Sequence, residues 1–123
     1  MAPRFQYALR VLAATDGGAP ALTVERSGAA APGPSFSVEL PRERWERLWA
    51  ELAAIDALGL GADLVGEERR GRVGVSFNQV ELRLGDRACR IDYLRSLLDE
   101  EGAEHAPHRA VIAAVKRLAD ERA

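Results

Sequence analysis

The chain has one cysteine, one lysine and no long apolar run, and each scarcity excludes a class of protein. Cys89 has no second cysteine to pair with, so no internal disulfide can form, which fits a reducing compartment. No apolar stretch approaches the roughly 18 residues that a membrane-spanning helix needs. The N-terminus lacks a basic stretch followed by a long apolar run, so we expect no signal peptide. The sequence therefore predicts a cytoplasmic protein with no membrane association.

The chain has slightly fewer basic side chains than acidic ones. Seventeen basic side chains stand against nineteen acidic ones, which gives a formal net charge of −2. A protein that binds duplex DNA usually has a basic face and a high isoelectric point. We therefore expect no nucleic-acid partner. Because Lys116 is the only lysine, nearly all the basic residues are arginines, as a GC-rich genome produces, and this enrichment alone does not indicate phosphate binding.

The length and the remaining composition suit one folded domain. The chain has 123 residues, of which 47% are apolar and 29% charged. These values are ordinary for a globular protein, and the length is too short for two domains of usual size. We expect a single domain over residues 1–123.

Alternating apolar residues predict two hairpins. Residues 4–12 and 21–26 alternate on either side of Gly17-Gly18, a pair that can adopt the positive φ angles of a tight turn. This arrangement places Val11 opposite Val24, both facing the core.

The second hairpin turns at Gly85-Asp86. Counting outward pairs Leu82 with Cys89 on the inner side. On the outer side, Glu81 lies opposite Arg90 as a favourable cross-strand ion pair.

Two irregular segments and one irregular point within a strand are predicted. Residues 27–35 are rich in small residues and proline, and residues 59–72 are rich in glycine and charge, so we expect a flexible connector and a long mobile loop. The apolar pattern changes parity between Phe77 and Val80. This change predicts a bulge or a bend at Asn78-Gln79.

A helix is predicted over about residues 41–57. Pro41 stands where the helix would begin. Its polar side carries opposite charges four residues apart, including Arg47 and Glu51, which are expected to pair along the helix. Its apolar stripe consists of Trp45, Leu48, Trp49, Leu52 and Ile55.

The remaining elements complete an order of β-β-β-α-β-β-α-α. Residues 36–40 alternate as a third strand, Asp92 is expected to cap a short helix, and Pro107 to begin the last helix. Hairpins make neighbouring strands antiparallel. We therefore expect an α+β fold, with a mostly antiparallel sheet of about five strands and helices packed on one face.

Three groups of residues could carry chemistry. Cys89 is the only thiol, but it shares strand parity with Ile91, so the alternation favours a buried apolar role over a nucleophile. His105 and His108 could ligate zinc or nickel together with Glu101 or Glu104. Since no further ligand and no HExxH pattern is defined, we interpret them as two solvated histidines.

The third group is a short basic cluster. Arg69, Arg70 and Arg72 follow two glutamates in the segment 59–72. Arginine can grip carboxylates or phosphates in a bidentate fork, so this cluster is the candidate partner-binding site; the alternative is a solvated loop. The glycine-rich segments lack the strand–loop–helix order of a phosphate-binding loop, and no GxSxG motif is present, so we expect no cofactor.

The layout of residues 5–95 resembles that of the emfourin-type inhibitors. The shared features are two leading strands, a strand that enters a proline-started helix, the segment Ile55-Asp56-Ala57-Leu58-Gly59-Leu60, and a following hairpin. Emfourin-type proteins are small bacterial inhibitors of thermolysin-like metalloproteases. The resemblance rests on layout and carries no functional residue onto this chain. It implies an inhibitor or binder that is not an enzyme.

These observations predict a non-enzymatic module that binds another protein or a second copy of itself. Inhibition of a partner is one form of this function. The alternative is a small ligand-binding or metal-binding protein, or an enzyme, that uses His105, His108 or Cys89.

Overall fold

Six strands form one mixed sheet in the computed structural model, which describes residues 7–27, 33–66 and 76–122. The elements in chain order are β1 (Tyr7–Thr15), β2 (Ala21–Ser27), β3 (Phe36–Glu39), α1 (Arg42–Glu51), the 3-10 helix η1 (Ala57–Gly59), β4 (Ala62–Asp63), β5 (Ser76–Leu84), β6 (Arg87–Tyr93), the 3-10 helix η2 (Arg95–Asp99) and α3 (Ala106–Arg122).

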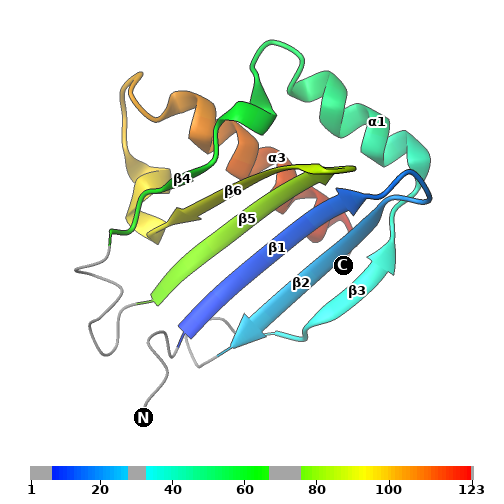
Figure 1. The fold of residues 1–123 in the computed structure, drawn as a ribbon. Coiled ribbons are helices and arrows are strands. Elements are labelled where there is room, and N and C mark those ends of the chain that lie inside the picture. Colours follow the sequence, from blue (N-terminus) through cyan, green and yellow to red (C-terminus); the bar gives the residue numbers. More distant parts are fainter. Residues whose placement is uncertain (1–6, 28–32, 67–75, 123) are drawn as a thin grey trace.

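The strand order is β3-β2-β1-β5-β6-β4. The pairs β3–β2, β2–β1 and β5–β6 are antiparallel, whereas β1–β5 and β4–β6 are parallel. The predicted α+β class is confirmed, and three of the five pairings are antiparallel, two of them in the predicted hairpins. The sheet has one strand more than expected, and it is mixed because β1 and β5 meet only after the chain has crossed over through α1 (Figure 1).

Both predicted hairpin registers are confirmed. Val11 lies opposite Val24 across β1 and β2, and Leu82 lies opposite Cys89 across β5 and β6. Positive φ is used at both turns, with Gly17 at 92° and Gly85 at 61°. These conformations are strained for residues with a Cβ atom, so glycine favours the turns at these points.

The predicted bulge at Asn78-Gln79 is wrong. The register of β5 runs through both residues without interruption, against β1 on one side and β6 on the other. Phe77 instead lies on the side of the sheet opposite Val80, and it is buried there. The change of parity therefore reflects burial on both sides of the sheet and not a break in the strand.

The predicted first helix is too long. Helix α1 ends at Glu51, and the chain then turns through i→i+3 hydrogen bonds, from Ala53 N–H to Ala50 and from Ile55 N–H to Leu52. Trp45, Leu48 and Leu52 are nevertheless buried, as the apolar stripe predicts.

Two further expectations about irregular segments are corrected. The segment 59–72 contains strand β4, which pairs with β6, and its residues 67–72 lie outside the described residues. Asp92 does not cap a helix, since it lies within β6 and the following 3-10 helix has Leu94 at its N-cap.

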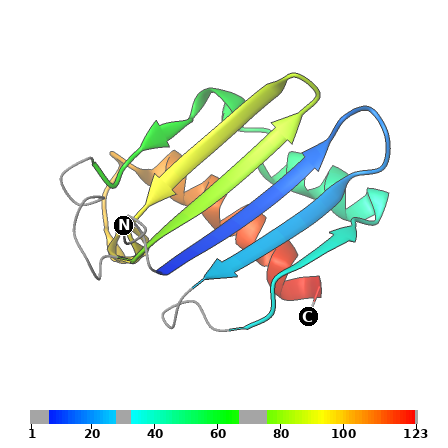
Figure 2. The ribbon, with the colours of Figure 1, turned by 60° about the horizontal axis from the view of Figure 1, so that its bottom comes forward.

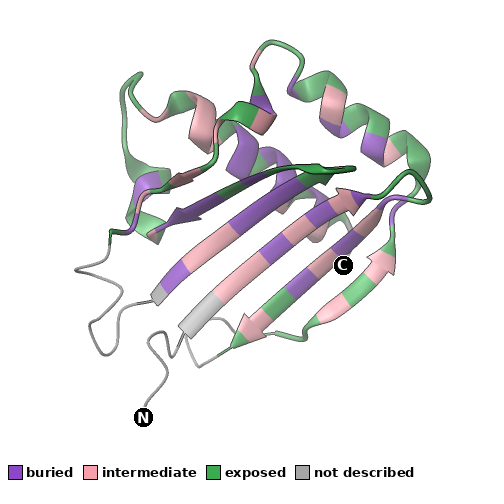
Figure 3. Ribbon diagram, viewed as in Figure 1, coloured by how far each residue is buried: buried purple, intermediate pink, exposed green. Residues whose placement is uncertain are grey.

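Helices α1 and α3 both lie on one side of the sheet (Figures 1 and 2). The buried positions along the strands and the helices form one apolar core, and along β2 they alternate with half-buried or exposed positions (Figure 3). Helix α3 contacts β1, β2 and β5, so it covers the middle of the sheet. Its fully buried side chains include Val111, Ile112 and Val115. Among the described residues, no helix is long and apolar enough to cross a membrane.

Leu82 and Leu84 provide a matched test of this core, because they lie on the same side of β5 but are 0% and 40% exposed. Leu82→Ala should lower the free energy of unfolding by about 2–5 kcal/mol, since it removes buried methyl groups and leaves a cavity. Leu84→Ala should cost less than about 1 kcal/mol, because an exposed side chain loses little on truncation. Urea unfolding would measure both; equal losses would contradict this account of the core.

Candidate interaction surfaces

The side of the sheet opposite helices α1 and α3 is the outer face of the sheet (Figure 2). Strand alternation places six charged side chains on it, from β1, β2, β5 and β6: Arg10, Glu25, Glu81, Arg83, Arg90 and Asp92. No described helix lies on this face.

Glu81 is the centre of an ion-pair network on the outer face. Its side chain is only 8% exposed. Its Oε1 accepts a hydrogen bond from Arg10 Nη2 at 2.9 Å, and its Oε2 accepts one from Arg83 Nη2 at 3.2 Å. Arg10 also approaches Glu25, with 3.6 Å between Nη1 and Oε1. The network therefore links β2, β1 and β5 across the joint between the two antiparallel parts of the sheet.

The expected ion pair between Glu81 and Arg90 is wrong, although the two residues do face each other in the register. Arg90 pairs along its own strand with Asp92, with 3.3 Å between Nε and Oδ1. Glu81 turns instead to the arginine on β1. Sequence reasoning missed this pairing because β1 and β5 come together only in the folded chain.

One end of the outer face is buried. Asp92 is 2% exposed and lies beside Asp63 of β4 in the register, and Phe77 on β5 is also 2% exposed. The most exposed charged side chains are Arg83 and Arg90, which lie nearer the turn at Gly85, and Glu25, which lies on β2 opposite Arg10.

The predicted partner-binding cluster, Arg69, Arg70 and Arg72, lies outside the described residues. Its role in partner binding stays a prediction from the sequence.

The prediction that Cys89 is buried is confirmed, since the residue is 1% exposed. Burial raises the pKa of its thiol. A backbone hydrogen bond with Leu60 lowers the pKa, and the negative charge of Asp56 adds to the increase. A nucleophilic cysteine needs the opposite environment, in which the thiolate is stabilised.

The sequence predicted two solvated histidines, but His105 and His108 are both half-buried. His105 Nδ1 lies 3.1 Å from Glu100 Oε2, and the rings of His105 and His108 contact each other edge to face, with 5.8 Å between centroids. The neighbouring acid is Glu100; Glu101 and Glu104, the expected candidates, are exposed. Among the described residues, no group of three or more His, Cys, Asp or Glu side chains could hold a metal ion.

Leu60 links two of the candidate residues. Its backbone affects the pKa of both, lowering that of the Cys89 thiol and raising that of the His108 imidazole. Cys89 on β6 and His108 near the start of α3 therefore both lie near Leu60. The sequence held no signal for this arrangement, because it depends on how residues 57–61 pass over β6.

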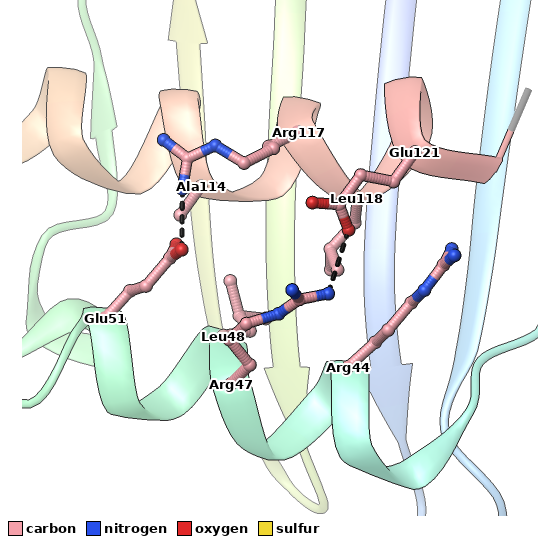
Figure 4. A pocket seen from close by; sticks show the side chains of 8 residues that line it. All are labelled: Arg44, Arg47, Leu48, Glu51, Ala114, Arg117, Leu118 and Glu121. Atoms are coloured by element: carbon pink, nitrogen blue, oxygen red, sulfur yellow. Dashed lines mark hydrogen bonds and ion pairs between the residues drawn. The ribbon is translucent and has the colours of Figure 1, made fainter.

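A shallow groove lies between α1 and α3 (Figure 4). Arg117 of α3 bonds Glu51 of α1 at 2.6 Å, and Arg47 bonds Glu121 at 3.1 Å. The expected pairing of Arg47 with Glu51 along α1 is therefore replaced by pairing across to α3. The groove encloses about 10 Å³, roughly what a single water molecule needs. It is too small for an organic ligand.

No family model, no curated protein and no solved structure matches this chain.

Replacement of Glu81 tests the network. Glu81→Gln should lower the free energy of unfolding by about 1–3 kcal/mol, because two arginines lose a nearly buried carboxylate partner. Glu25→Gln is the matched control, since Glu25 contacts the same Arg10 but its side chain is 59% exposed. That change should cost less than about 1 kcal/mol. Chemical unfolding at low and high salt would measure both losses, and similar values for the two variants would refute a structural role for Glu81.

His108 makes stability depend on pH. Burial lowers its pKa below the ordinary value, and the adjacent His105 lowers it further, while the backbone hydrogen bond with Leu60 acts in the opposite direction. As the pH falls through about 6.5, the unfolded chain binds the proton first. Stability should therefore fall as the pH decreases from about 7 to 5.5. Urea unfolding across this range should show a smaller fall for His108→Gln; an unchanged fall would exclude His108 as its source.

Proposed function

We propose that this chain is a non-enzymatic, cytoplasmic protein-binding module whose outer face contacts a partner protein. The observation that carries the proposal is the network of Arg10, Glu81 and Arg83, which holds charged side chains in place on a sheet face that no described helix covers.

Charged side chains that are fixed by ion pairs are well suited to binding a partner. A side chain that is already fixed by neighbours loses less conformational entropy when a partner binds. Arg83 keeps 48% of its side chain exposed while it bonds Glu81, and Arg90 keeps 59% while it bonds Asp92. Both arginine side chains therefore have surface left for a partner, and charged contacts of this kind set orientation and association rate more than affinity.

Protease inhibition is one concrete form of this function. The layout shared with the emfourin-type inhibitors supports it, and the partner would then be a thermolysin-like metalloprotease. Such a partner would be bound by surface contacts, so the function needs no catalytic group in this chain.

The alternative, an enzyme or a metal-binding or ligand-binding protein that uses His105, His108 or Cys89, has weaker support. The raised pKa of Cys89 keeps its thiol protonated near neutral pH. The shared contact of Cys89 and His108 with Leu60 is the observation in its favour.

Affinity capture tests the proposal. The tagged chain should recover one stoichiometric protein from a lysate of its own source organism, identified by mass spectrometry. The double variant Arg83→Gln/Arg90→Gln should bind that protein at least about tenfold more weakly, because two charged contacts are lost. The matched control is Arg42→Gln/Arg95→Gln, which removes the same charge from exposed positions off the outer face.

Two results would count against the outer face. Recovery of the chain alone would contradict a stable protein partner. Equal loss of binding in the test and control variants would assign the effect to net charge instead of to this surface. Unfolding curves of both variants would show that each remains folded.

A further inference from the structure

Strand β3 ends the sheet and has hydrogen-bonding groups directed away from it. Among the strands of the described residues, its only neighbour is β2. Leu40 N–H donates to Pro20 C=O at 2.7 Å, so this facing pair is a hydrogen-bonded one. In an antiparallel ladder, hydrogen-bonded pairs alternate with pairs that exchange no backbone hydrogen bond. Ser37 and Glu39 belong to the second kind, so their backbone N–H and C=O groups are directed away from β2.

A side-chain contact supports this assignment. Ser37 faces Thr23, and their hydroxyl oxygens are 3.0 Å apart. Side chains approach most closely in pairs that do not exchange backbone hydrogen bonds. The outward backbone groups of Ser37 and Glu39 have no hydrogen-bond partner among the described residues.

We propose that this edge pairs with the same edge of a second copy, antiparallel, about a two-fold axis that passes through Ser37. The pairing joins two six-stranded sheets into one. It uses the edge of the sheet and not its outer face, so it is independent of the protein-binding function proposed above.

The residues that would face each other fit this register. Phe36 lies opposite Val38 of the second copy, on the side of the helices, where both side chains are half-buried in the single chain. Glu39 lies opposite Ser35 of the second copy, so no two carboxylates meet. Ser37 lies opposite itself, with two reciprocal backbone hydrogen bonds.

The ends of the edge explain why a second copy fits better than a longer foreign strand. Pro34 and Pro41 flank the segment, and proline has no N–H to donate to a ladder. Pairing is therefore confined to residues 35–39. A segment of equal length with apolar residues at alternate positions matches this window, and β3 itself is such a segment. The centre of the edge also lacks the charged side chains that usually protect exposed edges.

Sedimentation equilibrium of the intact chain tests the proposal. The chain should dimerise reversibly. Ser37→Pro should raise the dissociation constant at least about tenfold, because it removes the outward N–H that both copies use while leaving the bonds to β2. Ser37→Ala is the matched control. It loses the same hydroxyl contact with Thr23 but keeps the N–H, so its dissociation constant should stay within about twofold of the original.

Covalent trapping gives a second measurement if Ser37→Pro does not fold. In a Cys89→Ala background, Ser37→Cys should form a disulfide-linked dimer under mild oxidation, because residue 37 meets itself on the axis. Ser27→Cys, also exposed but on β2, should not. A chain that stays monomeric at about millimolar concentration, a dimer unaffected by Ser37→Pro, or equal trapping of both cysteines would each overturn the proposal. All these experiments use the purified chain alone. Their outcome is therefore independent of whether affinity capture recovers a partner protein.

Discussion

The carboxylate of Glu81 holds together the two parts of the sheet. Strands β3, β2 and β1 form one antiparallel part, and β5 with β6 forms another. Between them lies the parallel pairing of β1 with β5, where Arg10 reaches Glu81 on one side and α3 packs across both strands on the other. A carboxylate that is 8% exposed requires its cationic partners, because an unpaired charge in that position is costly.

The same ion pair makes the register of β5 specific. Glu81 lies beside Leu12 in the parallel pairing and between the core residues Val80 and Leu82 along its own strand. A shift of β5 by one residue would turn Glu81 into the apolar core and Val80 out of it. The outer-face charges and the core therefore select the same arrangement, and the exposed part of Arg83 is positioned as a consequence.

The sequence predicted the local parts of this structure and missed the distant ones. Alternation around Gly17 and Gly85 was enough to predict both hairpin registers, because period and turn chemistry act over few residues. The burial of Cys89 followed from the same parity. The pairing of Arg10 with Glu81 joins residues 71 positions apart, and no local pattern reports such a contact. Strand β4 was missed because two residues are too few to show a period.

In the candidate sites too, local patterns predicted the side of the sheet on which a residue lies but not its distant contacts. Alternation was enough to place Glu81 and Arg90 on the outer side of the sheet, but their ion-pair partners depend on which strands become neighbours. The contact between His105 and Glu100 depends on the path of the segment before α3, so the sequence suggested the wrong acids. Where helices cover one side of a sheet, the surfaces left for recognition are the other side and the edges. The first offers side chains, and the second offers backbone groups.

The parallel joint also has a consequence for how the chain is made. Tyr7 pairs with Ser76, so β1 is synthesised about 70 residues before the strand that covers its second edge. At roughly 5–20 residues per second, that interval lasts several seconds. Throughout it, β1 can form its hairpin with β2, but its other edge and the inner side chains of Val11 and Ala13 have neither β5 nor α3 to cover them. The nascent protein thus carries an unpaired strand edge with Arg10 in its middle, and a charge at such a position hinders the wrong strands from pairing there before the right one arrives.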